Sequence, residues 1–202
     1  MDEGRRVSSS VTRPSVCVYC GARPGVGEQW LKQAHLMGEA IAARGWRLVY
    51  GGGNVGLMGA VADAALANGA EVVGVIPERL LTLEVAHQGL SELVVVQTMH
   101  QRKQRMAELS QGFVALPGGI GTFEELFEVW TWRHLGYHQH PIGLLNAQGF
   151  FDGLLSFLAQ TETAGFTDPS QHAMLSVERD VDALLDRMAG AMHTSTGSFQ
   201  LI

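Results

Sequence analysis

The sequence has little of what disulfide-stapled, membrane-spanning or nucleic-acid-binding proteins depend on. It contains 2 cysteines in 202 residues, too few for a disulfide framework. No apolar run reaches the ~18 residues that a membrane span needs. Charged residues make up 17%, the net charge is −6 and no basic block occurs, which argues against a general nucleic-acid binder. The opening residues are polar and predict no signal peptide, so we expect a cytoplasmic protein without membrane or nucleic-acid partners.

Length and composition predict one folded domain. Hydrophobic residues make up 46% of the chain, which excludes a disordered protein, and 202 residues correspond to little more than one domain of about 150 residues. We expect a disordered N-terminal tail over residues 1–13, a domain over residues 14–190 and a flexible C-terminal tail over residues 191–202.

Short apolar runs alternate with helical segments along this domain. Runs without polar alternation predict strands buried on both faces, at Val16–Cys20, Arg47–Tyr50, Glu71–Ile76, Leu93–Gln97, Gly112–Leu116 and Ile142–Leu145. Helices are predicted at Glu28–Arg44, Val55–Ala67, Met99–Ser110, Thr122–Leu135, Phe150–Thr163 and Val181–Met188. This alternation indicates an α/β fold with a parallel sheet between two helical layers. Ligands of such folds bind beyond the carboxyl ends of the strands, near the topological switch point.

Two glycine-rich loops each follow a strand and open a helix. One is Gly51–Gly56, with Gly59 after it, and the other is Pro117–Thr122; together they hold eight of the 25 glycines. Glycine lets backbone N–H groups approach an oxyanion closely, and the N-terminus of a helix attracts negative charge. Both loops therefore indicate phosphate binding, although plain tight turns are the alternative.

The first loop also matches the dinucleotide fingerprint Gly-x-Gly-x-x-Gly. That fingerprint expects an acidic residue about 20 residues on, and only Glu78 could serve, because Glu71 opens its strand at the wrong end. A P-loop NTPase is excluded, since no Gly-Lys-Ser/Thr follows either loop.

Glu125 has two interpretations. Thr122 and Glu125 have the spacing of a capping box, which predicts a structural role at the start of a helix. The functional alternative is a carboxylate held beside a phosphate-binding turn.

Helix Met99–Ser110 carries two cations on its apolar side. Met99, Met106 and Leu109 mark that side, and the helical period places Arg102 and Lys103 on it. A buried arginine needs a polar or anionic partner. One possibility is a structural salt bridge with a neighbouring carboxylate. The other is a functional contact, either with a ligand phosphate or with a substrate atom that gains charge.

Helix Thr122–Leu135 is apolar on too many sides for one core. Trp130 and Trp132 point roughly 200° apart at about 100° per residue. We predict that this helix lies in the interface of a homodimer; an aromatic lining a base pocket is the alternative.

Two other patterns predict no site. Cys17 and Cys20 form a Cys-x-x-Cys within a predicted strand, where we expect their side chains to point to different faces or to the strand end. His134, His138 and His140 have no acidic partner nearby, so we expect a solvated helix end and no metal site. The two lysines, Lys32 and Lys103, form no recognisable pyridoxal-phosphate site, and we expect no cofactor.

Two motifs together carry a family resemblance. Residues 117–125 match Pro-Gly-Gly-x-Gly-Thr-x-x-Glu, and residues 99–103 match Met-His-x-Arg-Lys. With the triple-glycine turn at 51–53, the chain closely resembles the Lonely Guy (LOG) family of cytokinin riboside 5′-monophosphate phosphoribohydrolases, formerly mislabelled lysine decarboxylases. The resemblance implies a Rossmann-like, doubly wound, three-layer fold that is usually a homodimer. It also implies hydrolysis of the N-glycosidic bond of AMP or N6-isopentenyl-AMP, which releases the base and ribose 5-phosphate.

The resemblance also implies roles for individual residues. The catalytic pair falls on Arg102 and Glu125. The residues that would bind phosphate and ribose are Gly118, Gly119, Ile120, Gly121, Thr122, Lys103, Gly21, Gly52 and Gly53. Glu84 and His87 are weaker candidates for the base, and Ala22 stands where family members often have serine. Glu125 would stabilise an oxocarbenium ion and orient water, and Arg102 would stabilise the leaving group or the phosphate.

Two other functions compete with this one. A protein of the same fold could bind nucleotides without hydrolysing them, as a ligand sensor does. An NAD(P)-dependent oxidoreductase depends on the glycine fingerprint alone. The joint presence of Arg102 and Glu125 favours the enzyme.

Overall fold

The computed structural model describes residues 13–81 and 85–194. These residues form one parallel seven-stranded sheet in the order β4-β3-β2-β1-β5-β6-β7. The strands are β1 (Ser15–Tyr19), β2 (Arg47–Tyr50), β3 (Val72–Pro77), β4 (Glu92–Val96), β5 (Gly112–Ala115), β6 (Ile142–Leu145) and β7 (Leu175–Glu178). The doubly wound fold class is thus confirmed, as are all six strands expected from the sequence.

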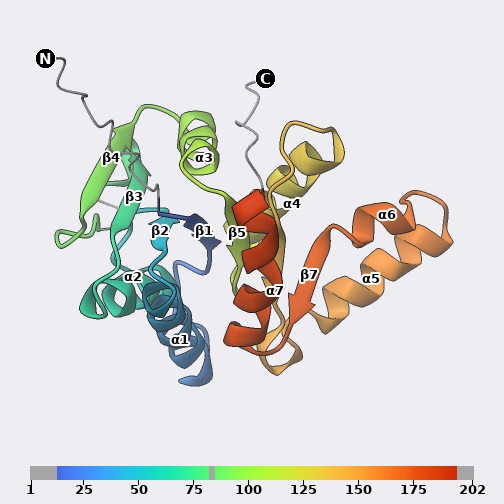
Figure 1. Cartoon of the computed structure of the whole chain (residues 1–202), viewed down its shortest axis with the longest axis horizontal. Coiled ribbons are helices and arrows are strands. Elements are labelled where there is room, and N and C mark those ends of the chain that lie inside the picture. Colours follow the sequence, from blue (N-terminus) through green and yellow to red (C-terminus); the bar gives the residue numbers. More distant parts are fainter. Residues whose placement is uncertain (1–12, 82–84, 195–202) are drawn as a thin grey trace, which may run out of the picture.

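Helices cover both faces of the sheet (Figure 1). They are α1 (Gln29–Ala43), α2 (Gly56–Ala67), α3 (Met99–Glu108), α4 (Ile120–His134), α5 (Asp152–Thr163), α6 (Pro169–His172) and α7 (Val181–Thr194), with 3₁₀ turns at Glu78–Leu80 and Ala147–Gly149. One buried cluster joins the sheet to α1, α2 and α7, and a second joins it to α3, α4 and α5. These two cores give the expected three layers.

The sequence did not predict α6 or β7, and it misjudged the environment of β4. Helix α6 has 4 residues, and β7 has 4 residues at the edge of the sheet, so neither is long enough to show a clear period. Strand β4 lies at the opposite edge, where Val95 is 47% exposed; it is not buried on both faces. Met99, expected in the buried stripe of α3, is also exposed.

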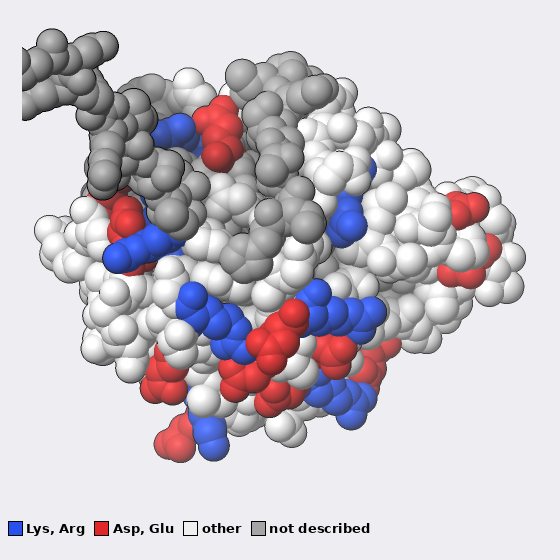
Figure 2. Space-filling model, in the orientation of Figure 1, with Lys and Arg blue, Asp and Glu red and all other residues white. Residues whose placement is uncertain are grey.

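The C-terminal helix packs beside α1. Helix α7 runs to Thr194, beyond the domain end expected at residue 190. Arg44 at the end of α1 pairs with Asp182 at 2.8 Å and Asp186 at 2.6 Å, and Figure 2 shows charges of both signs intermingled on the face that includes α1 and α7. Most of the tails expected at residues 1–13 and 191–202 lie outside the described residues. Within the described ranges, no helix is long and apolar enough to cross a membrane.

The strand order creates one switch point, between β1 and β5. From β1 the chain winds outward through β2, β3 and β4, and it then returns to place β5 on the other side of β1. The loops after β1 and β5 consequently leave the sheet in opposite directions and open a crevice between them.

Candidate active site

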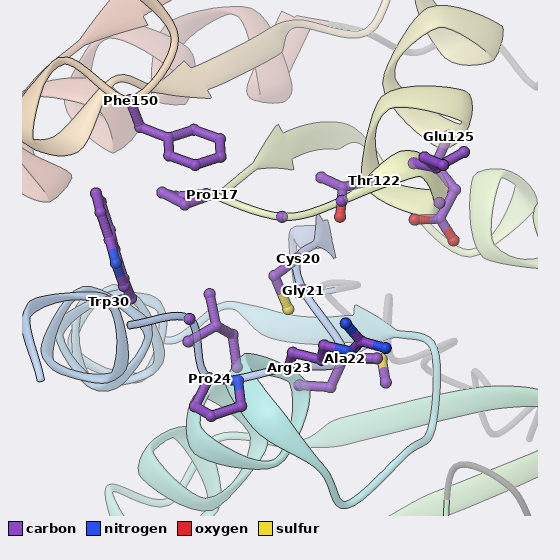
Figure 3. Close-up of a pocket in the computed structure, with 17 residues that line it drawn as sticks. Cys20, Gly21, Ala22, Arg23, Pro24, Trp30, Pro117, Thr122, Glu125 and Phe150 are labelled. Atoms are coloured by element: carbon purple, nitrogen blue, oxygen red, sulfur yellow. The ribbon is translucent and has the colours of Figure 1, made fainter. Parts of the chain in front are cut away.

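A cavity of about 580 Å³ lies at this switch point. Its walls are the segment after β1 and the glycine turn after β5, with Trp30 and Phe150 at one end and Glu125 at the other (Figure 3). The lining residues are Cys20, Gly21, Ala22, Arg23, Pro24, Gly25, Trp30, Leu57, Met58, Pro117, Gly118, Gly119, Ile120, Gly121, Thr122, Glu125 and Phe150. A cavity of this volume accommodates a nucleotide-sized ligand.

The second glycine turn forms the start of α4 inside this cavity. Gly119 is the N-cap of α4 and no side chain caps the helix. The first N–H groups of a helix have no acceptor within it and attract anions. A Cβ at Gly118 would lie 2.1 Å from Oγ1 of Thr122 and 2.9 Å from N of Gly21, so only glycine fits there. The turn thus has the geometry of an anion site.

The expected capping box at Thr122 is wrong. Helix α4 begins at Ile120, which places Thr122 in the third helical position and makes Gly119 the N-cap. A helix that starts two residues earlier exposes the N–H groups of the glycine turn at its own N-terminus, and Thr122 is buried beneath them.

Glu125 is half-buried one turn into α4 and lines the cavity. Burial raises the pKa of the Cys17 thiol, the Glu125 charge raises it further and the Arg102 charge lowers it. Both charges therefore act near β1, and the tertiary structure brings the carboxylate and the guanidinium into the same region.

Arg102 is buried on α3, as the helical period predicted, and is 4% exposed. Its Nε donates to the carbonyl of Val75 at 3.1 Å and its Nη2 to the carbonyl of Gly51 at 2.9 Å. A Cβ at Gly51 would lie 2.1 Å from that Nη2. The first residue of the triple-glycine turn is thus glycine because the guanidinium packs against it. Arg102 does not belong to the lining of the cavity itself.

Lys103, to which the family resemblance gives a phosphate- and ribose-binding role, contacts two carboxylates in the structure. Its Nζ donates to Glu124 and, at 2.9 Å, to Glu128, both on α4. Burial alone would lower the pKa of Lys103, but the two carboxylates outweigh burial and raise it. Lys103 ties α3 to α4 behind the cavity and is not one of the residues that line it.

The first glycine loop binds its own chain. Gly52 has φ +77°, its carbonyl accepts from the N–H of His87 at 3.0 Å, and Gly53 forms a bridge with Ala86. Neither Gly52 nor Gly53 lines the cavity, whereas Gly21 does and donates to the carbonyl of Pro117 at 3.2 Å.

Of the two base-pocket candidates, His87 lies within the described residues but does not line the cavity. Glu84 falls outside the described residues. His87 is buried, its Nε2 lies 2.9 Å from Oδ1 of Asp63, and its Nδ1 accepts from the N–H of Gly89 at 3.0 Å. The structural partners of His87 explain its burial without a ligand.

Several of the lining residues were missed by sequence reasoning. Arg23, Trp30 and Phe150 belong to no motif. The rings of Trp30 and Phe150 pack edge-to-face, with their centroids 5.5 Å apart. Arg23 could have been found from its position just beyond a strand that borders the switch point. Phe150 could not, because its loop after β6 reaches the cavity only through the fold.

Of the two patterns for which the sequence predicted no site, the cysteines lie as expected and two of the histidines do not. Cys17 and Cys20 are free thiols buried in opposite cores, as strand geometry predicted. The solvated helix end expected at His138 and His140 is wrong: both are buried, and burial lowers the pKa of His138 to about 4. Among the described residues, no group of three or more His, Cys, Asp or Glu side chains could hold a metal.

Known proteins resemble this chain in sequence and in fold. A family model described as "Possible lysine decarboxylase" matches residues 58–188. The cytokinin riboside 5′-monophosphate phosphoribohydrolase of Rhodococcoides fascians is 50% identical over 175 residues, 86% of this chain and 88% of that protein. The enzyme of the same name, LOG1, from Arabidopsis thaliana is 43% identical over 162 residues, 80% of this chain and 76% of that one.

A solved structure shows the same fold at lower sequence similarity. The molybdenum cofactor binding protein of Rippkaea orientalis superposes with a TM-score of 0.68 at 20% identity, covering 90% of this chain and 98% of that one. At this identity the similarity concerns the fold alone.

Proposed function

The chain belongs to the Lonely Guy (LOG) family of cytokinin riboside 5′-monophosphate phosphoribohydrolases, and on that premise we propose that it hydrolyses the N-glycosidic bond of AMP or an N6-modified AMP. The observation that carries this proposal is a single cavity holding both the uncapped N-terminus of α4 and Glu125. The first suits the 5′-phosphate and the second suits the reacting ribose.

The chemistry requires charge stabilisation on both sides of the bond that breaks. Water adds to C1′ of the ribose, the bond to the base nitrogen breaks, and its electron pair leaves with the base, which takes up a proton. Positive charge develops on the sugar, where the Glu125 carboxylate stabilises it and orients the water. The N–H groups at the start of α4 hold the phosphate and so fix C1′ near that carboxylate.

Arg102 acts from beneath the first glycine loop. Its two hydrogen bonds to Gly51 and Val75 fix the guanidinium in a buried position, where a fixed charge costs no reorganisation during the reaction. We assign to it the stabilisation of negative charge on the departing base or on the phosphate.

Incubation with AMP and with N6-isopentenyl-AMP tests this function. We expect free adenine or free isopentenyladenine together with ribose 5-phosphate, detected by liquid chromatography. A nucleotide sensor would bind these compounds and return them unchanged. If neither nucleotide yields a base, the proposed hydrolysis is wrong.

The structure gives no support to a dinucleotide-dependent oxidoreductase. The fingerprint loop follows β2, and its Gly52 and Gly53 do not line the cavity. Glu78 lies in a 3₁₀ turn after β3 and is also absent from the lining. The phosphate-binding geometry belongs to the other glycine turn.

A homodimer through α4 remains part of the proposal. Leu135, the C-cap of this helix, is 60% exposed and Phe127 is 36% exposed. Phe127, Trp130 and Leu158 border a hollow of about 170 Å³. Part of the surplus apolar surface is covered within the chain, since Nε1 of Trp130 donates to the carbonyl of Gln171 at 2.9 Å. The rest is available to a second copy.

Replacing Leu135 by aspartate is expected to shift the protein from dimer to monomer at micromolar concentration. A buried unpaired carboxylate is costly in an interface, whereas Leu36→Asp on α1, which is also exposed, should leave the dimer intact. Light scattering after size exclusion measures the mass of each variant. A wild-type chain that is already monomeric under these conditions would remove the proposal.

A further inference from the structure

Arg23 stands out in the cavity wall. Of the described residues that line the cavity, Arg23 and Glu125 are the charged ones. Arg23 is exposed, and no hydrogen bond or ion pair engages its guanidinium in the parts of the chain that the structure covers. An arginine in this position is ready to pair with an anion from solution.

The backbone around Arg23 packs against α2, while the side chain of Arg23 is exposed. The carbonyl of Gly21 accepts from the N–H of Leu57 at 3.0 Å. A Cβ at Gly56 would lie 2.6 Å from N of Arg23 and 2.5 Å from C of Ala22. This peptide therefore packs directly on the first turn of α2, which fixes where the guanidinium can reach.

The other two cations near the site are already engaged. Arg102 binds two backbone carbonyls and Lys103 binds two carboxylates. Neither is among the residues that line the cavity, so the charge of each acts on the cavity from outside its lining. Direct attraction for an anion in the cavity comes from Arg23 and from the N-terminus of α4.

These two features face each other. Figure 3 shows Arg23 on the side of the cavity opposite the turn that leads to Thr122. A phosphate monoester between them would accept from the N–H groups of the turn on one side and from the guanidinium on the other. Ala22 offers no hydroxyl, so the arginine supplies the polar side-chain contact of this segment.

We propose that Arg23 is a substrate-binding residue that pairs with the 5′-phosphate and makes the enzyme select nucleotides over nucleosides. This inference rests on the proposed function, because it takes a nucleoside 5′-monophosphate as the ligand. It assigns to Arg23 the phosphate contact that the family resemblance implied for Lys103.

Arg23→Gln tests the assignment with ribose 5-phosphate, AMP and adenosine as probes. We expect the affinity for ribose 5-phosphate, measured by calorimetry, to fall by about 10- to 100-fold, as for the loss of a charge-assisted hydrogen bond. KM for AMP should rise by a similar factor with little change in kcat. Binding of adenosine should not change, and Arg23→Lys should recover part of the affinity.

Arg187→Gln is the matched control for Arg23→Gln. Arg187→Gln removes a surface arginine of α7 that pairs with Glu178 and should bind all three probes as the wild type does. The assignment is overturned if Arg23→Gln keeps wild-type affinity for ribose 5-phosphate, or if AMP and adenosine weaken equally. Arg23-dependent binding of ribose 5-phosphate by a wild type that releases no base would support this inference while refuting the proposed hydrolysis.

Discussion

Replacing Glu125 by glutamine should lower kcat for base release by about 10²- to 10⁴-fold, the range typical of a lost general acid or base. The amide keeps the size of the side chain but carries no negative charge, so it can neither stabilise a cationic sugar nor take a proton from water. Since Glu125 is half-buried and lines the cavity, we expect the melting temperature to change little. Steady-state kinetics with AMP and thermal unfolding of the same preparation measure both quantities.

Glu124→Gln provides the matched control for this prediction. Glu124 is the neighbouring carboxylate on α4, but it pairs with Lys103 and does not line the cavity. We expect its loss of activity to be far smaller than that of Glu125→Gln. Equal activity of the Glu125 variant and the wild type would reduce Glu125 to a structural residue.

Replacing Arg102 by methionine is expected to reduce kcat by about 10²- to 10³-fold, as when a preorganised donor or charge is removed from an active site. Arg102→Lys should restore little of this, because an ammonium cannot reach the two carbonyls of Gly51 and Val75 with the fixed geometry of a guanidinium. Circular dichroism and thermal unfolding are needed beside the kinetics, since the same two hydrogen bonds also hold the first glycine loop. A folded Arg102→Met variant with full activity would refute the role.

Gly51→Ala is a second, independent test of the role of Arg102. Its Cβ would lie 2.1 Å from Nη2 of Arg102, so the guanidinium must move although the arginine is still present. We expect this variant to reproduce part of the kinetic defect of Arg102→Met. Gly153→Ala on α5, where a Cβ would meet no atom within 4 Å, should remain as active as the wild type.

The sequence predicted the fold because local signals and topology agree. Buried strands in a parallel sheet are continuous apolar runs, and the helices between them show their own period, so six of the seven strands could be located. Strand β7 was missed because its 4 residues lie at a sheet edge, where one flank faces no neighbouring strand and the apolar pattern is weak.

The sequence also indicated two parts of the candidate site, the glycine turn after β5 and Arg102. A glycine turn between a strand and a helix needs no tertiary information to be recognised, and neither does the buried position of Arg102 on an amphipathic helix. The switch-point rule then places the turn after β5 at the site. The sequence could not supply the exact start of α4, because one backbone turn decides whether Thr122 caps the helix or lies within it.

By itself, therefore, the sequence determined the α/β fold, and it singled out the glycine turn at Gly118 as a candidate phosphate site and Arg102 and Glu125 as candidate catalytic residues. Only the tertiary structure decided which cation faces the cavity. Lys103 lies within the Met-His-x-Arg-Lys motif and Arg23 belongs to none, yet Lys103 pairs with Glu124 and Glu128 whereas Arg23 lines the cavity. The reason is physical: a side chain's partners depend on which distant segments the fold brings within about 3 Å of it, and no local pattern records that distance.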